Sequence, residues 1–199
     1  FYGFSGVQGK ADYMVTSRNL KFGKLANGKM IELPYGDGKF AMYVVLPDSN
    51  DKKGFTEFLS GLTSESISSA IKESTSQAII NLALPKFNEN CKLELSEILQ
   101  SMGINGVFDP SASNFSETLQ NKAKDDVYVS SVIQKSCLSV TEWGTEAAAV
   151  SEVEFDAVDG PGRIEEIDFV VNRPFFYFIS EKSSGVILFE GVYTGVSID

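Results

Sequence analysis

The sequence predicts a mixed α+β fold in which strands dominate. Short apolar runs bounded by Gly, Pro, Asn and Asp recur along the chain and are typical of strands, whereas a few stretches have the apolar spacing of amphipathic helices. The chain has 199 residues, 43% of them hydrophobic, so it can bury a sizeable core. We therefore expect a single domain over residues 1–199.

Residues 30–46 predict a β-hairpin. Two apolar runs, residues 30–35 and 40–46, are separated by the turn Gly36-Asp37-Gly38. A polar turn that begins at Pro47 ends the second strand.

Three stretches have the spacing of amphipathic helices, and Gly103 follows the third where a left-handed cap would end it. The apolar residues of each face are Phe55, Phe58, Leu59 and Leu62, then Ile67, Ala70 and Ile71, and then Leu95, Ile98, Leu99 and Met102.

Four further strands are expected downstream of the hairpin. Residues 77–84 form a short apolar run that a proline ends, and residues 127–142 are rich in Val, Ile, Ser and Thr. We expect the second of these runs to be one long strand of a large sheet. Residues 169–179 and 186–194 predict two buried strands, and the Ser-Ser-Gly turn between them predicts a C-terminal hairpin.

The segment from residue 144 to 168 is unusual. It contains eight acidic residues and a single basic one, Arg163. A connection of about 25 residues without clear structure is uncommon in a compact domain and is usually functional or disordered. Its opening residues, 144–149, are mostly small and fit a strand or a helix at little steric cost. This composition favours a conformational switch over a solvated linker.

Composition excludes several classes of function. A net charge of −10 repels phosphate backbones and argues against nucleic-acid binding. No apolar run approaches the ~18–20 residues of a membrane-spanning helix. The chain contains no histidine, which removes Ser–His and Cys–His dyads and histidine-bound zinc, and it has no Gly-rich phosphate loop. We expect no enzyme activity, no cofactor and no metal site.

Two cysteines and one sequon bear on the cellular compartment. Cys91 and Cys137 do not have the spacing of a disulfide framework or a metal site, and we expect them to be free and buried. Asn114 begins an Asn-Phe-Ser sequon in a turn-rich stretch, which makes it a glycosylation candidate and is compatible with secretion.

Several motifs resemble the serpin family, the serine protease inhibitors. Residues 142–149 (EWGTEAAA) are similar to the family's hinge, and residues 169–179 (FVVNRPFFYFI) are similar to its C-terminal signature. The resemblance implies a serpin fold, with large β-sheets, surrounding helices and a reactive centre loop at residues 144–168. Supporting matches occur in family order at residues 31–35, 42–47, 84–87 and 186–191.

The resemblance also implies a mechanism of suicide inhibition. A protease cleaves the loop and forms an acyl-enzyme, and the freed loop then inserts as a new strand into the main sheet and traps the protease. Insertion would begin at Gly144 and Thr145, so a large or charged residue at Thr145 should block trapping. The complete hinge is Gly144, Thr145, Glu146, Ala147, Ala148 and Ala149.

Family spacing places the reactive bond about sixteen residues after Glu142, between Val158 and Asp159. A small aliphatic residue there suits an elastase-like protease. Ala157 or another neighbour is one alternative, and Arg163-Ile164, which suits a trypsin-like protease, is the other. The target is expected to be a serine protease, and a cysteine protease stays open.

Lys86 and Glu142 match family positions that pair at the top of the main sheet, where insertion starts. The alternative is an ordinary surface ion pair, worth less than about 1 kcal/mol. Trp143, directly before the hinge, departs from the family pattern and is a candidate for slowing insertion or anchoring the loop.

The matching motifs correspond to the C-terminal half of a serpin. We therefore expect the chain to need the N-terminal half, covalently joined or as a second polypeptide, to fold and to inhibit. A non-inhibitory serpin with a carrier, chaperone or storage role is the alternative function. Secretion is the expected location, and an intracellular one stays open.

Overall fold

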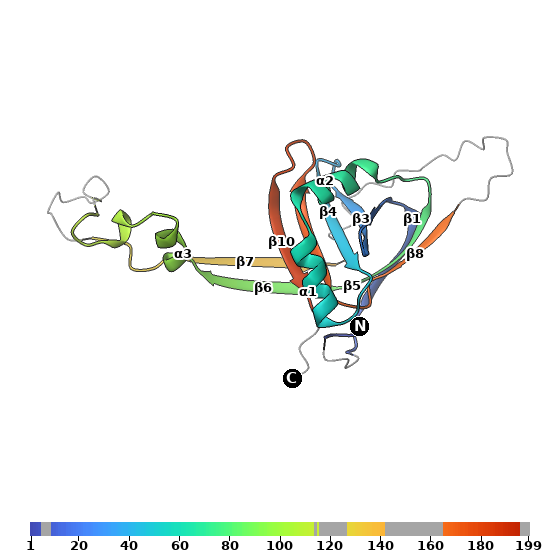
Figure 1. The fold of residues 1–199 in the computed structure, drawn as a ribbon, viewed down its shortest axis with the longest axis horizontal. Coiled ribbons are helices and arrows are strands. Elements are labelled where there is room, and N and C mark those ends of the chain that lie inside the picture. The colour runs from blue at the N-terminus through green and yellow to red at the C-terminus, as the bar shows by residue number, and fades with distance from the viewer. Residues whose placement is uncertain (5–8, 114, 116–126, 142–164, 196–199) are drawn as a thin grey trace. The chain divides into compact units, whose positions relative to one another are not determined.

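A computed structural model describes residues 1–4, 9–113, 115, 127–141 and 165–195 (Figure 1). The contacts divide the chain into two compact units. Unit 1 comprises Phe1–Phe87 and Val140–Asp199, and unit 2 comprises Asn88–Ser139. Both sheet-forming strands and helices are present, which confirms the α+β class.

Unit 1 is built on a five-stranded antiparallel sheet with the order β10-β9-β4-β3-β2. The predicted hairpin is confirmed, and its turn contains Gly36 and Gly38, both with positive φ. The strands are β2 (Lys21–Leu25), β3 (Gly28–Tyr35), β4 (Phe40–Pro47), β9 (Phe175–Glu181) and β10 (Ile187–Tyr193).

Two helices, α1 (Lys52–Gly61) and α2 (Ser64–Glu73), pack on this sheet as the apolar spacing predicts. Asp51 caps α1, and Thr63 forms a capping box with Ser66 at the start of α2. Gly28 permits the close approach of α1, because a Cβ at this position would lie 2.7 Å from the Phe58 ring. The buried cluster beneath the helices contains Met30, Ala41, Tyr43, Val45, Phe58, Ala70 and Phe178.

A second sheet of unit 1 has three strands in the order β1-β5-β8. They are β1 (Tyr13–Asn19), β5 (Ile79–Pro85) and β8 (Glu166–Val170), with β1 antiparallel and β8 parallel to β5. The strand expected at residues 77–84 is thus confirmed. β1 was not expected, because its sequence, YMVTSRN, has only three apolar or aromatic residues, followed by four polar ones.

Glu32 is a buried charge in the five-stranded sheet, with only 4% of its surface exposed. Lys182 Nζ donates to Oε1 over 2.5 Å, Lys21 Nζ lies 3.7 Å from Oε2, and the Tyr43 hydroxyl donates to Oε2 over 3.3 Å. Burial, and then the negative charge of Glu32, raise the pKa of Tyr43. The cluster joins β2, β3, β4 and the residue that follows β9.

The C-terminal region differs from the prediction in two ways. Residues 169–179 are not one strand, because β8 ends at Val170 in one sheet and β9 begins at Phe175 in the other. Pro174 has no N–H to donate to a ladder, so the chain can change sheets there. The β9–β10 hairpin is confirmed, with Gly185 at positive φ, but most of β10 is exposed rather than buried.

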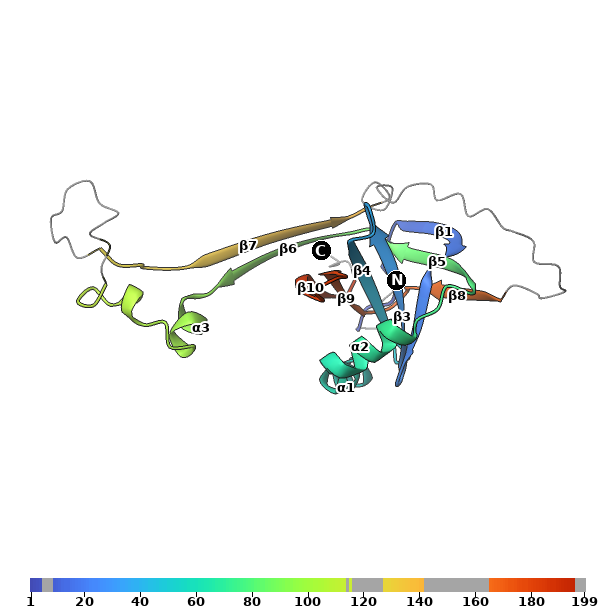
Figure 2. The same ribbon diagram turned by 90° about the horizontal axis from the view of Figure 1, so that it is seen from above.

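Unit 2 contains helix α3 (Ser96–Ser101) and a two-stranded sheet of β6 (Phe87–Glu94), whose first residue belongs to unit 1, and β7 (Ile133–Val140), whose last residue does. The Leu95 N–H donates to the Val132 carbonyl over 2.8 Å, linking the end of β6 to the start of β7, so the strands run in opposite directions (Figure 2). Gly103 follows α3 with φ of +93°, as the cap predicts.

Two expectations for this region are wrong. Residues 127–132 are not part of the strand, because Val129 and Val127 hydrogen-bond to the Val107 carbonyl and to the Ser113 hydroxyl instead of extending a ladder. Cys91 and Cys137 are free as expected, but both are exposed, because they lie in unit 2, where no described residue is buried.

Candidate functional site

The segment predicted to carry the function is described only at its two flanks. The upstream flank is β7 with Thr141, and the downstream flank is Glu165 with β8. The remaining predicted site residues lie outside the described part of the chain and stay predictions. They are Asn114, Glu142, Trp143, Gly144, Thr145, Glu146, Ala147, Ala148, Ala149, Ala157, Val158, Asp159, Arg163 and Ile164.

The downstream flank begins earlier than the sequence suggested. Residues 166–168, expected in the loop, form the first part of β8, so the expected end of the loop at residue 168 is too late. The Ile79 N–H donates to the Glu165 carbonyl over 2.9 Å, and pairing continues to Ala83 opposite Val170. β5 supplies the backbone partners that the mainly acidic sequence of this stretch did not reveal.

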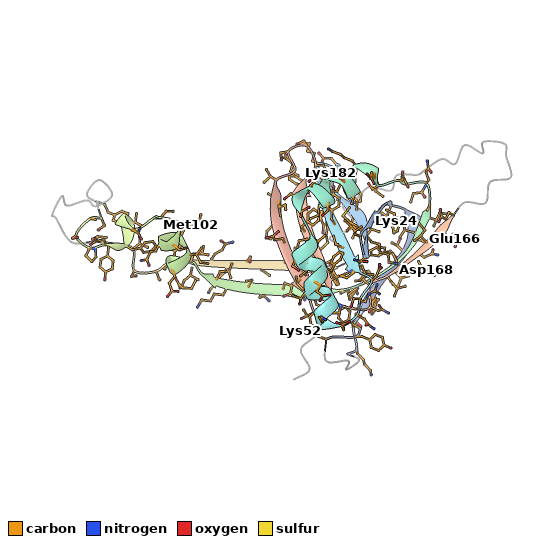
Figure 3. The ribbon with its side chains drawn as sticks, viewed as in Figure 1. Lys24, Lys52, Met102, Glu166, Asp168 and Lys182 are labelled. Carbon is orange, nitrogen blue, oxygen red and sulfur yellow. The ribbon has the colours of Figure 1, made fainter. Side chains whose placement is uncertain are left out.

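A polar network crosses the exposed face of this sheet. Ser17, Asn81 and Asp168 lie in one cross-strand row of β1, β5 and β8. The Ser17 hydroxyl donates to Asn81 Oδ1 over 2.7 Å, and Asn81 Nδ2 donates to Asp168 Oδ1 over 3.1 Å and to Glu166 Oε2 over 3.4 Å. Figure 3 labels the two acidic residues along β8.

Lys29 reaches β8 from the other sheet. Its Nζ donates to the Asp168 carbonyl over 3.0 Å and lies 5.0 Å from the centre of the buried Phe169 ring, a cation–π distance. Burial, and then the nearby positive charge of Arg173, lower the pKa of Lys29. The main chain and one neighbouring side chain of β8 are therefore held by a residue of β3.

Arg173 stabilises the crossing between the two sheets. Its Nε donates to the Pro47 carbonyl over 2.8 Å, and burial lowers the pKa of its guanidinium while the charge of Asp48 opposes that shift. The Val171 N–H donates to the Ala83 carbonyl over 2.8 Å. These bonds fix the part of the C-terminal signature that lies between β8 and β9.

The upstream flank, β7, is mostly exposed. Val140 is buried, whereas the other residues of β7 are exposed or half-buried. Among the described residues, β7 has one hydrogen-bonded neighbour, β6, so its other edge carries no described strand. Lys86 is half-buried, and its backbone N–H donates to the Asp12 carbonyl over 2.7 Å. Its predicted pairing with Glu142 stays a prediction.

Sequence reasoning missed Ser17, Lys29 and Asn81. The only signal for Asn81 is its type, because Asn is depleted in strands and here interrupts the apolar run of β5. Lys29 comes from a different sheet, and sequence spacing alone gives no sign of that contact.

The rest of the described structure adds no chemical centre. No group of three or more potential metal-ligating His, Cys, Asp or Glu side chains occurs among the described residues. No helix in the described ranges is long and apolar enough to cross a membrane. A pocket of about 440 Å³ lies between the β2–β3 turn and α1, and it contains none of the predicted site residues.

Comparison with known proteins gives consistent matches. The family model for "Serpin (serine protease inhibitor)" matches residues 1–195. An uncharacterized serpin-like protein of Methanosarcina mazei is 33% identical over 96% of this chain and 43% of its own length. Serine protease inhibitor 2 of Anopheles gambiae is 32% identical over 96% of this chain and 46% of its own length.

A solved structure agrees with these matches. The native-state crystal structure of tengpin, a thermophilic serpin, is 28% identical with a TM-score of 0.70, and the match covers 98% of this chain and 49% of tengpin. The chain thus spans about half the length of the relatives that it matches.

Proposed function

The chain belongs to the serpin family, in which it corresponds to the C-terminal half, and from this premise we propose that it carries the bait loop of a protease inhibitor. One observation supports the proposal most strongly. The segment with the small-residue hinge directly follows β7, and the other edge of β7 carries no strand among the described residues. An open strand edge is a template for a further strand.

The proposed reaction starts at the bond between Val158 and Asp159. The protease nucleophile attacks the Val158 carbonyl, an acyl-enzyme ester or thioester forms, and the amine of Asp159 leaves with the proton that the nucleophile gives up. The hinge, Gly144 to Ala149, then joins the open edge of β7. The acyl-enzyme is carried along with the inserting strand and is trapped before water can hydrolyse it.

The other side of the insertion slot is proposed to come from the N-terminal half of the fold. β7 offers one edge, and a new strand between two neighbours needs a second edge to satisfy its remaining backbone groups. We propose that this half is joined to the chain or supplied as a second polypeptide. Lys86 and Glu142 would pair where the slot opens.

Val158 as the residue before the cleaved bond favours an elastase-like target. Arg163 would favour a trypsin-like protease, and the acidic segment would steer a basic protease of either kind toward the loop. A cysteine protease target would use the same bond. Secretion and glycosylation of Asn114 are further proposals, which a glycosidase-sensitive mass shift of the expressed protein would test.

A non-inhibitory role as a carrier, chaperone or storage protein is the second candidate. Trp143, directly before the hinge, is the observation that favours it, because a bulky aromatic residue there could hold the loop out of the sheet. In that case, proteases would cleave the loop without being trapped.

The test is incubation of the chain, paired with the N-terminal half of a related serpin, with elastase-, chymotrypsin-, trypsin- and papain-like proteases. We expect a covalent complex that survives denaturing electrophoresis, and a released C-terminal peptide that begins at Asp159. Thr145→Arg should abolish the complex while cleavage continues, and Thr145→Ser is the matched control that should trap normally. Cleavage without any complex for the unmodified chain would contradict the proposal.

A further inference from the structure

β8 is the strand that follows the proposed bait segment, yet only a short backbone pairing holds it in its sheet. It has five residues and, among the described residues, one hydrogen-bonded neighbour, β5. The pairing is parallel, which is slightly less stable per residue than antiparallel pairing. Side-chain contacts can therefore contribute a large part of what keeps β8 in register.

Asn81 lies at the centre of the side chains that hold β8. It is the middle member of the row Ser17–Asn81–Asp168, and its amide donates to Asp168 and also to Glu166, two residues earlier on the same face. Two carboxylates two residues apart repel each other, and one amide NH₂ between them supplies both with a charge-assisted hydrogen bond. A shift of β8 by one residue would turn both carboxylates to the other face.

Ser17 fixes the orientation of that amide. Its hydroxyl donates to Asn81 Oδ1 over 2.7 Å, so the oxygen of the amide faces β1 and the nitrogen faces β8. Lys29 holds the main chain at the same point through the Asp168 carbonyl. β8 is thus held at Asp168 by its side chain and by its backbone.

We propose that Asn81 is the positioning residue that fixes the downstream end of the bait segment, with Ser17 orienting its amide. The inference rests on the proposed function of residues 142–164. The register of β8 sets how much chain is available between the two flanks. A slip of two residues, the smallest that keeps the same face, would move the reactive bond relative to its anchor by roughly 7 Å.

The test is hydrogen exchange of the 199-residue chain followed by peptide mass spectrometry. In Asn81→Asp, a carboxylate replaces the NH₂ donor opposite two carboxylates. We expect exchange in residues 166–170 to rise about tenfold or more, while β4 stays protected as an internal reference. Asn90→Asp, an exposed position on β6 with the same charge change, should leave β8 unchanged.

A rescue variant distinguishes the loss of the specific Asn81–Asp168 contact from a general loss of stability. Asn81→Asp combined with Asp168→Asn returns an amide to the row from the opposite side, and we expect β8 protection to recover to within about threefold of the unmodified chain. If Asn81→Asp also raises hydrogen exchange in β4, the uncharged Asn81→Ser is used instead. We expect Asn81→Ser to raise exchange in β8 and not in β4. Unchanged β8 exchange in these variants, or absence of rescue, would overturn the inference.

Protease trapping distinguishes this inference from the proposed function. Suppose that Asn81→Asp raises exchange in β8 but that the unmodified chain, paired with an N-terminal half, traps no protease. The positioning role of Asn81 then stands, and the inhibitor proposal fails. If the unmodified chain traps a protease and hydrogen exchange in β8 does not change in the Asn81 variants, the inhibitor proposal stands and the positioning role of Asn81 fails. If both hold, Asn81→Asp should lower the trapped fraction, and the rescue pair should restore it.

Discussion

Unit 1 and unit 2 differ in whether they bury their apolar side chains. In its described residues, unit 1 has two sheets, two packed helices and a core with many side chains excluded from water, including Ile31, Phe169 and Phe175. Within the described part of unit 2, no residue is buried. Its exposed large hydrophobic residues are Leu93, Ile98, Met102, Ile104, Val107, Val127, Tyr128 and Ile133.

The two units therefore differ in the share of their apolar side chains that they leave uncovered. Exposed apolar patches of this extent usually mark an interaction surface. Hydrogen bonds alone contribute little net stability to a two-stranded sheet in water, so β6 and β7 need a covering surface. The expectation that the whole chain needs the N-terminal half to fold is therefore narrowed: we infer that unit 1 is stable on its own core and that only unit 2 is completed by the N-terminal half.

Removal of a core side chain should have the largest effect, and only in unit 1. Phe175 is fully buried among Phe87, Tyr177 and Tyr193, so Phe175→Ala should lower the free energy of unfolding by about 3–5 kcal/mol. Met102→Ala in unit 2, where the side chain is 72% exposed, should change it by less than about 0.5 kcal/mol. Urea unfolding followed by circular dichroism measures both. Equal losses would contradict the contrast.

A buried charge should have a smaller effect. Glu32→Gln removes the carboxylate from between Lys182, Lys21 and Tyr43 and should cost about 1–3 kcal/mol of unfolding free energy. Glu97→Gln, at an exposed position in unit 2, is the matched control and should be near neutral. Urea unfolding measures the free energy of unfolding of both variants. If Glu32→Gln leaves it unchanged, the cluster does not stabilise unit 1.

The smallest effect expected is an alkaline loss of stability in unit 1. Burial raises the pKa of Tyr35 and Tyr43 above the unfolded value near 10. Below pH 10 both states keep the phenol proton, and above it the unfolded state ionises first, so stability falls as pH rises. Urea midpoints at pH 9 and pH 11 measure the loss. Tyr43→Phe should reduce it, and an identical loss in that variant would refute the assignment.

Much of unit 1 could be predicted from the sequence because its signals are local. The hairpin turn at Gly36-Asp37-Gly38 and the helical stripe at Phe55 and Phe58 each depend on a few adjacent residues, and so does the cap at Gly103 in unit 2. The errors occur where distant residues decide the outcome. β8 is a strand because β5 lies beside it, and β10 is exposed because no described element covers it.

The candidate site shows the same division. The family motifs predict a hinge in the segment that follows β7, because they are continuous runs of sequence, and this assignment stays a prediction. Asn81 was missed because its hydrogen-bond partners, Ser17 on one strand and Asp168 on another, are far apart in sequence. Spacing along the chain cannot reveal a row that exists only after three strands have paired.

Hydrogen exchange of both units, with and without the N-terminal half of a related serpin, tests the central claim most directly. In the chain alone, we expect strong protection in β4 and β9 and exchange at least ~100-fold faster in β6 and β7. Addition of the N-terminal half should slow exchange in β6 and β7 and leave β4 and β9 nearly unchanged. Equal protection of both units in the chain alone, or no gain in β6 and β7 on addition, would contradict the account.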